Sequence, residues 1–344
     1  MSSAGLAGLS NNLLYSAMVV YALAMYCYTA SLAFSRPGRV PAEERVEDTT
    51  QGLVQEPTEV RELAAVGGSG STTTYDVEHT AGGATATPDL PERADRLSRV
   101  GVSLTVLAFA LHLGAVVTRG LSADRAPWGN MFEFSVTGAL AVTGVYLVLL
   151  RRHDIRYLGT FVVLPVLLTL GLAVTVLYTE SAQLVPALKS VWLVIHVSAA
   201  IIASGILTVG FAQTVCFLVQ DRREQRPVEA RTPSFMDRLP SAAALDRSAY
   251  RMHAFAYPIW TFAVIAGAIW AENAWGRYWG WDPKETWAFI TWMVYTAYLH
   301  ARATAGWKGR KASYVALLGY ATFLFNYLVV NIWLVGFHSY AGVG

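Results

Sequence analysis

The chain has 344 residues, of which 54% are hydrophobic and only 15% charged, and its formal net charge is +2. Soluble domains carry about 25% charged residues, so this composition excludes an ordinary soluble domain and is typical of a membrane protein. The near-neutral charge argues against nucleic acid as a partner. The two cysteines, Cys27 and Cys216, lie in apolar runs without a C-x-x-C or C-x-x-C-H motif. The sequence therefore predicts neither a disulfide scaffold, nor a thiol oxidoreductase of the usual kind, nor a c-type cytochrome.

The first apolar run, residues 11–34, has no Lys or Arg before it, and the positive charges follow it. This order predicts a retained N-terminal helix over 1–35 whose N-terminus is outside, rather than a cleaved signal peptide. A spanning helix needs about 20 mostly apolar residues. Such runs occupy 11–34, 99–118, 131–150, 157–178, 190–219, 254–271, 285–301 and 313–335. We therefore predict an all-α polytopic membrane protein with about eight transmembrane helices.

The distribution of Lys and Arg predicts the orientation of these helices. With the N-terminus outside, the inner segments are 35–99, 151–156, 220–252 and 302–312, and they hold 21 of the 26 Lys and Arg residues. The outer segments 119–130, 179–190 and 272–285 hold the other 5. Because positive residues accumulate on the cytoplasmic side, both termini and the tryptophan-rich loop at 272–285 are expected outside.

Residues 36–98 differ in kind from the rest of the chain. Residues 36–97 hold half of the acidic residues, a single aromatic, Tyr75, and runs rich in Gly, Ser and Thr. Such a segment buries too little apolar surface to offset its ordering entropy, which predicts a mostly disordered cytoplasmic loop that acts as a tether. Its role stays open. Residues 99–344 then form the main transmembrane domain.

The stretch WGRYWGWDPKETW, residues 275–287, concentrates four tryptophans between two apolar runs. Asp282, Pro283 and Glu285 have the spacing of an N-cap, a first helical residue and the third position of a capping box, so a helix is expected to begin there. An aromatic belt at the membrane interface would explain one or two tryptophans at a helix end. Trp275, Trp279 and Trp281 with interleaved glycines favour instead a platform for a large planar ligand.

Two of the seven histidines fall at the depth of this loop. His196 lies near the outer end of the run 190–219, and His338 follows the last run. Porphyrin iron takes neutral imidazole nitrogen, often from two faces. A histidine at a membrane interface is more often a hydrogen-bonded side chain, but the pair beside an aromatic loop favours heme ligation.

Three further histidines lie in or next to other runs. His300 is expected about 22 Å below the outer surface, where it is either a functional group or a residue capping the helix beside Arg302. His112 is interpreted as forming a hydrogen bond between helices, with a ligand role as the alternative. His253 is interpreted as an interface residue next to Arg251, with a ligand role as the alternative.

The segments KSVWLVIH, WGRYWGWDPKETWAFITW, YLHAR and FNYLVVNIWLVGFHSY closely resemble the CcsA/ResC-type cytochrome c biogenesis proteins of the heme-handling superfamily with a WWD signature. The resemblance covers roughly 100–344. Where many relatives have Trp-Trp, this chain has Tyr278-Trp279. The resemblance implies heme b as cofactor, His196 and His338 as external iron ligands and His300 as a transmembrane ligand. It also implies a heme contact by Trp279, Trp281 and Asp282, although the structural role of Asp282 as the helix cap is favoured.

The resemblance further implies a multi-pass protein of the cell (plasma) membrane with an extracytoplasmic active face. Together with a ResB/Ccs1-type membrane protein it would carry heme across the bilayer and attach it to C-x-x-C-H motifs of apocytochrome c, as a subunit of a heme lyase or synthase. No side chain is an obvious general acid or nucleophile for that step. Two alternatives stay open: a heme exporter without synthase activity, and a membrane b-type electron-transfer cytochrome.

Overall fold

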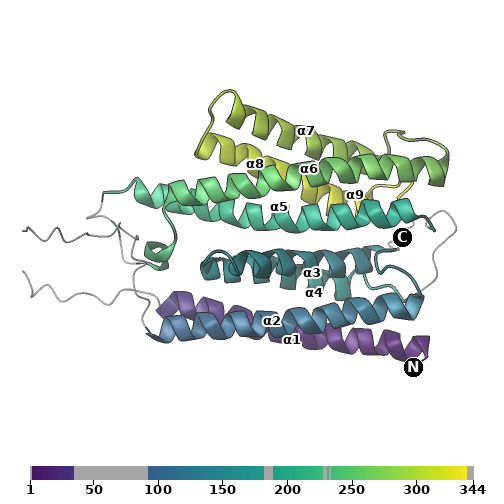
Figure 1. Cartoon of the computed structure of the whole chain (residues 1–344), viewed down its shortest axis with the longest axis horizontal. Coiled ribbons are helices and arrows are strands. Elements are labelled where there is room, and N and C mark those ends of the chain that lie inside the picture. The colour runs from purple at the N-terminus through teal and green to yellow at the C-terminus, as the bar shows by residue number, and fades with distance from the viewer. Residues whose placement is uncertain (1, 35–91, 182–188, 228–230, 232–233, 339–344) are drawn as a thin grey trace, which may run out of the picture. The chain divides into compact units, whose positions relative to one another are not determined.

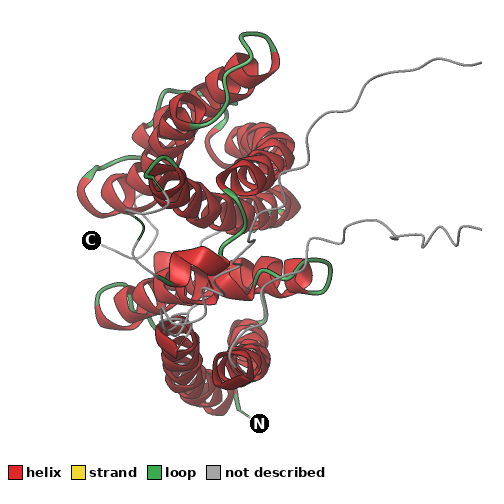
Figure 2. Cartoon of the chain, turned by 90° about the vertical axis from the view of Figure 1, so that its left-hand side faces the viewer, coloured by secondary structure: helices red, strands yellow, loops and turns green. Residues whose placement is uncertain are grey.

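The computed structural model describes residues 2–34, 92–181, 189–227, 231 and 234–338, and all regular secondary structure in these ranges is helical (Figure 2). Residues 1–36 and 90–344 form one compact unit, to which the following description applies. The described helices confirm the predicted all-α class. Residues 36–91 of the predicted loop lie outside the described residues.

Helix α2 (Glu92–Ala123) begins seven residues before the predicted run at 99. Glu92 and Asp95 lie in its first turn and pair with Arg96 and Arg99 one turn later. Acidic side chains near a helix N-terminus and i,i+4 ion pairs stabilise a helix without any apolar stretch. The hydrophobic run therefore marks the expected membrane segment, whereas the helix itself extends beyond it.

The first half of the chain packs α1 (Ser3–Phe34) along α2, followed by α3 (Met131–Leu150) and α4 (Gly159–Thr175), which a 3₁₀ turn at Arg156–Leu158 introduces (Figure 1). The interior between these helices is aliphatic, with buried tyrosine hydroxyls joined to threonines of neighbouring helices. Tyr28 and Thr105, for example, join α1 to α2 at 3.1 Å. Such pairs give buried hydroxyl groups a hydrogen-bond partner where water does not reach them.

The second half packs α5 (Val191–Glu224) along α6 (Ala242–Trp275), with α7 (Pro283–Ala303) and α8 (Arg310–Leu324) beside them (Figure 1). A 3₁₀ turn at Phe235–Arg238 precedes α6. The run predicted as one helix at 313–335 is interrupted, because a π-helix at Phe325–Val329 separates α8 from the short α9 (Val330–Trp333). A π-helix is rare and often marks a functional site.

Seven of the described helices are long and apolar enough to cross a membrane: α1, α2, α3, α4 with its 3₁₀ turn, α5, α6 and the stretch Arg310–Trp333. The eighth predicted span, at α7, does not meet this measure. Its sequence is rich in Trp, Tyr and Thr rather than in aliphatic residues and ends in His300 and Arg302, which lowers its mean hydropathy. The chain is a multi-pass membrane protein in which α7 lies against α6 and α8.

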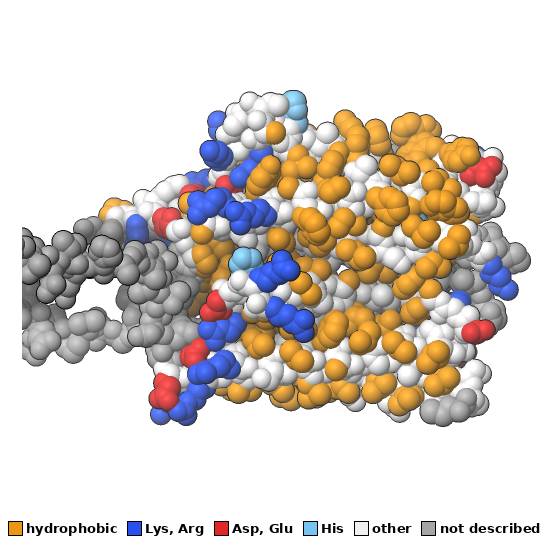
Figure 3. Space-filling model, viewed as in Figure 1, with side chains coloured by type: hydrophobic (Ala, Val, Ile, Leu, Met, Phe, Trp, Pro, Cys, Tyr) orange, Lys and Arg blue, Asp and Glu red, His pale blue; other side chains and the backbone are white. Residues whose placement is uncertain are grey.

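Successive helices alternate in direction, so the start of α1, the end of α9 and the loop between α6 and α7 lie at one end of the bundle (Figure 1). Lys and Arg side chains gather at the other end, and orange apolar side chains cover the surface between the two (Figure 3). The loop between α6 and α7 is thus at the end that carries fewer positive side chains.

Candidate functional site

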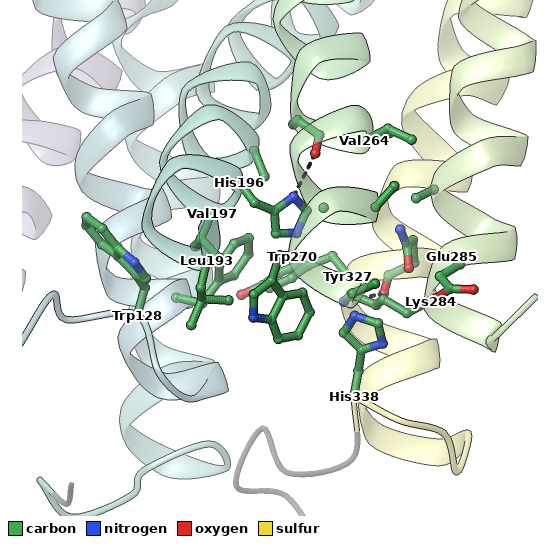
Figure 4. Close-up of a pocket in the computed structure, with 18 of the residues that line it drawn as sticks. Trp128, Leu193, His196, Val197, Val264, Trp270, Lys284, Glu285, Tyr327 and His338 are labelled. Carbon is green, nitrogen blue, oxygen red and sulfur yellow. Dashed lines mark hydrogen bonds between the residues drawn. The ribbon is translucent and has the colours of Figure 1, made fainter. Parts of the chain in front are cut away.

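A cavity of about 190 Å³ opens at the end of the bundle that carries the tryptophan-rich loop (Figure 4). Its walls come from the segment before α3, from α5, α6, the start of α7 and the last helical stretch, and from residue 338. Aromatic rings form much of the lining, among them Trp128, Trp260, Trp270, Trp275, Tyr278 and Trp279. Segments far apart in sequence therefore build one apolar pocket with a few polar groups, as in small-molecule sites.

His196 enters this cavity from α5. Its Nδ1 lies 2.7 Å from the carbonyl oxygen of Ala263 on α6, and since a carbonyl only accepts, Nδ1 carries the proton. Nε2 of the neutral ring is then a free lone pair. Gly267 makes room for the ring, because a Cβ there would lie 2.7 Å from Cε1 of His196. Trp270 stacks parallel to the imidazole, with ring centroids 6.3 Å apart.

His338 reaches the cavity from beyond the end of α9, and its ring centroid lies 5.9 Å from that of Trp270 (Figure 4). Its Nδ1 donates to Oδ2 of Asp282 at 2.8 Å, and Oδ1 of Asp282 accepts from the Phe337 amide at 2.7 Å. Burial lowers the pKa of His338 below its ordinary value, although the hydrogen bond to Asp282 acts in the other direction. Neutral His338 thus also presents a free Nε2.

The Asp282 carboxylate has two functions. Burial alone raises its pKa, but the hydrogen bonds from His338 and Phe337 bring the pKa below its usual value, so it is ionised at neutral pH. Asp282 also caps α7, with its Oδ2 3.4 Å from the Lys284 amide, while Glu285 accepts from the Asp282 amide at 3.1 Å. The predicted capping box is confirmed, and the same residue orients a histidine.

The loop itself is short and tightly defined. Gly276 ends α6 in the left-handed conformation (φ 68°), and its amide donates to the Glu272 carbonyl at 2.8 Å. A residue with a Cβ adopts this conformation with strain, so glycine is favoured there. Trp281 has φ 58° without being a glycine. Such strain in a non-glycine residue occurs where the surrounding structure imposes it, often at functional sites.

The predicted tryptophans do not all face the cavity. Trp275 and Trp279 line it, whereas Trp281 does not; its side chain is 64% exposed and packs edge-on against Trp279 at 5.8 Å. Trp270, absent from the predicted site, is buried and lies against both His196 and His338 (ring centroids 6.3 and 5.9 Å). The spacing of residues 260, 263, 267 and 270 on one helical face was the sequence signal for it.

Lys284 is a second residue that the sequence analysis did not select. It lines the cavity, and its ammonium donates to the carbonyl oxygen of Asn326 in the π-helix at 3.1 Å. Asn326 is itself 4% exposed and lines the cavity. The π-helix therefore supplies the acceptor that holds this cation beside the two imidazoles.

His300 is not brought together with His196 and His338. It is exposed in the last turn of α7, about 24 Å along that helix from Lys284. His253, predicted at the membrane interface, is enclosed by neighbouring helices. Because α6 begins at Ala242, His253 lies inside the helix; it is fully buried, 3.1 Å from the Thr214 hydroxyl and beside Tyr295 and Tyr298.

The interpretation of His112 as a contact between helices is confirmed. Its Nδ1 lies 3.4 Å from the hydroxyl of Tyr21 on α1, and the two rings meet edge-on. His112 is fully buried.

The cavity places two neutral imidazoles with free Nε2 atoms among indole rings, a donor set that suits the iron of a porphyrin. Typical small-molecule pockets measure about 300–1,000 Å³, so this cavity of about 190 Å³ is smaller than a macrocycle needs. Such a ligand would fill the cavity and extend past its mouth, where Tyr278 is 61% exposed.

The chain is similar to a family of known proteins. The family described as cytochrome c assembly protein matches residues 128–338. A protein from Microcystis aeruginosa named cytochrome c biogenesis protein CcsA is 35% identical over 71% of this chain and 87% of its own. The protein of the same name from Picosynechococcus is 34% identical over 75% and 91%. That from Guillardia theta is 35% identical over 70% and 85%.

One solved structure, titled cytochrome c heme lyase CcmF, superimposes with a TM-score of 0.59 at 16% identity. The match covers 95% of this chain but 47% of that one, so it concerns the fold alone. The family match extends over more than half of the chain and includes every wall of the cavity, from Trp128 to His338. The chain therefore belongs to the cytochrome c assembly protein family, as a multi-pass membrane protein of CcsA-type cytochrome c biogenesis.

Proposed function

We propose that this chain carries heme across the membrane and presents it in the cavity between His196 and His338 for covalent attachment to C-x-x-C-H motifs of apocytochrome c. One observation carries the proposal. Two histidines separated by 142 positions line one aromatic cavity, and each uses Nδ1 to donate to a fixed acceptor. This hydrogen-bonding pattern leaves both Nε2 atoms as iron ligands and is typical of metal-binding histidines.

The number of ligands favours porphyrin iron over a bare metal ion. A protein zinc site uses three or four side chains, whereas a porphyrin supplies four nitrogens and needs only one or two from the protein. No cluster of three or more His, Cys, Asp or Glu residues with metal-binding geometry occurs within the described ranges. Two imidazoles are therefore enough for porphyrin iron but not for a zinc site.

Thioether formation adds a cysteine S–H across a vinyl group of heme, so that a C–S bond forms and the hydrogen goes to the neighbouring carbon. The reaction consumes no oxidant. The contribution of the chain is then to hold heme in one orientation with an edge at the cavity mouth, which raises the effective concentration of vinyl and thiol. In this proposal the chain is a subunit of a heme lyase that acts with a ResB-type partner.

His300 belongs to an earlier stage of the proposed pathway. Its exposure on α7, away from the cavity, supports a role in which it faces a second membrane protein rather than the interior of this chain. A ligand from the ResB-type partner would then complete an iron site within the membrane. Heme would move from there to His196 and His338.

The proposed orientation places the cavity on the extracytoplasmic side, because the positive side chains gather at the other end (Figure 3). Single cysteines test this in a background with Cys27 and Cys216 replaced. A membrane-impermeant maleimide is expected to label Tyr278→Cys in intact cells and Lys308→Cys only after permeabilisation. The reverse labelling would overturn the orientation.

The function itself is tested by co-expression with the ResB-type partner and a reporter apocytochrome. His196→Ala and His338→Ala are each expected to abolish covalently bound heme in the reporter and to weaken the heme absorbance of the purified complex. His153→Ala, at an exposed loop position, is the matched control. Heme binding and holocytochrome that persist in both site variants would overturn the proposal. Heme that is delivered without thioether formation would identify an exporter instead.

A further inference from the structure

We infer that Lys284 is the residue that recognises a carboxylate of the bound macrocycle and thereby fixes which edge of heme enters the cavity. The inference rests on the proposed function and deepens it. Heme has two acidic propionate groups on one edge and two vinyl groups elsewhere on the ring. A cation at a fixed position in the cavity would therefore determine which edge remains at the mouth.

The position of the ammonium group is the first observation. Lys284 is the second residue of α7, and its side chain lines the cavity among Trp260, Trp275 and Tyr327. Nζ donates to the Asn326 carbonyl oxygen at 3.1 Å. When Lys284 is protonated its Nζ carries three protons, and in the part of the chain that the structure describes this is the single hydrogen bond from Nζ. Two donors remain for a ligand.

Three of the four oxygens of the neighbouring carboxylates are already engaged, which is the second observation; within the described residues Oε1 of Glu285 has no hydrogen-bond partner. Asp282 accepts from His338 and Phe337, and Glu285 accepts from the Gly280 and Asp282 amides and lies 3.6 Å from Arg277. Within the described residues neither carboxylate forms an ion pair with Lys284. A cation in an apolar pocket without a counter-charge is costly, and burial lowers the pKa of Lys284 to about 7, although the charge of Asp282 acts in the other direction. A carboxylate on the ligand would supply that counter-charge.

The arrangement also separates orientation from iron binding. In the proposed function His196 and His338 would hold the iron, which by itself would leave the orientation of the macrocycle within the cavity unfixed. One charge-assisted hydrogen bond to a propionate would fix that orientation. Placing the acidic edge at Lys284, inside the cavity, directs a different edge to the mouth beside Tyr278.

The test compares two ligands that differ in carboxylates alone. Protoporphyrin IX and its dimethyl ester, both without iron, are titrated into the full-length chain in detergent, with binding followed by porphyrin fluorescence. The native chain is expected to prefer the diacid by roughly ten- to hundredfold, the range for a hydrogen bond to a charged group. Lys284→Met should bring the two affinities together, and Lys284→Arg should keep much of the preference. Lys308→Met, an exposed lysine, is the matched control.

Each outcome is informative. A Lys284→Met variant that weakens diacid and diester by the same factor has lost a structural contact, which would overturn the inference while leaving the proposed function intact. The same holds if the native chain shows no preference. If the native chain binds neither the porphyrins nor heme, both the inference and the proposed function are wrong. Because the porphyrins lack iron, a defect in histidine ligation does not alter the comparison.

Discussion

Nδ1 of His338 donates to Oδ2 of Asp282 at 2.8 Å, which ties the chain beyond the last helix to the cap of α7, 56 residues earlier. The carboxylate fixes the tautomer of the imidazole and increases its basicity, as in metal sites where a carboxylate supports a histidine ligand. The link between the tryptophan-rich loop and the C-terminal histidine is therefore a direct hydrogen bond.

Asp282→Asn is expected to weaken heme binding about 10- to 100-fold, the usual effect of losing such a supporting carboxylate. Asparagine is as good an N-cap as aspartate, so α7 should still form and the change reports on His338 rather than on the helix. The measurement is a heme titration followed by Soret absorbance. Glu272→Gln, at an exposed residue near the end of α6, is the control. Equal affinities in native chain and Asp282→Asn would contradict the prediction.

Gly267→Ala is expected to displace the His196 ring, because the new Cβ would lie 2.7 Å from Cε1. Overpacking of this kind costs about 1–3 kcal/mol. Heme affinity should fall together with the free energy of unfolding, and the bound heme should change its absorbance spectrum as one ligand is lost. Gly171→Ala on α4 is matched to it, since nothing lies within 4 Å of a Cβ there. A Gly267→Ala variant with the native heme spectrum would refute the placement of His196.

Bound heme is expected to be lost on acidification, and the loss should lie below pH ~6.5, the ordinary pKa of histidine. Burial lowers the pKa of His338, so the ring stays neutral, and Nε2 available to iron, down to that pH. Below it, protons compete with iron for Nε2. The Soret band is followed from pH 8 to 5.

The heme-free chain gives a second test of the role of Asp282. The Asp282 carboxylate raises the pKa of His338, so in heme-free Asp282→Asn the imidazole, followed by NMR, should take up its proton at lower pH than in the native chain. A loss of bound heme already complete at pH 7, or a His338 pKa that rises in Asp282→Asn, would be inconsistent with the assigned role of His338.

Glu133→Gln is expected to destabilise the chain by about 3–5 kcal/mol, the cost of breaking a buried ion pair on one side. The Glu133 carboxylate is buried and accepts from Arg119 at 3.0 Å, Arg125 at 2.6 Å and the Gly129 amide at 2.9 Å. Without its charge both guanidinium groups lose their counter-ion. Thermal unfolding in detergent measures the effect, and Glu180→Gln, at an exposed residue, should leave stability unchanged. A difference below about 1 kcal/mol would count against a structural role for this cluster.

Local interactions explain why several features of the fold could be predicted. Asp282, Pro283 and Glu285 define the start of α7 through contacts within four residues, so their spacing alone predicts the cap. The apolar runs predict the helices for the same reason, since a membrane segment is defined by its own side chains. The predicted starts of α2 and α6 were less accurate, because polar turns extend each helix beyond its apolar run.

Contacts between distant segments determine the features of the site that could not be predicted from the sequence. Trp270 and Lys284 belong to the site because of helices that pack beside them. The helical spacing of Trp270 with residues 260, 263 and 267 places them on one face, but the sequence does not show which helices that face meets. Trp281 is a residue type that often contacts planar ligands, but its ring points away from the cavity. The backbone at Trp281 has a positive φ, and the ring is exposed. His253 is buried because α6 extends past the predicted start and packs against α5.

The sequence by itself determined the membrane class, the helical segments, the cap of α7 and the residues His196 and His338 as a pair to consider, because hydropathy and capping depend on side chains close together in the chain. The tertiary structure alone decided that these two histidines share one cavity, which nitrogen of each is free, and that Asp282 and Lys284 stand beside them. Those relationships depend on which faces of α5, α6, α7 and the last helical stretch meet, and packing rather than local sequence sets those faces.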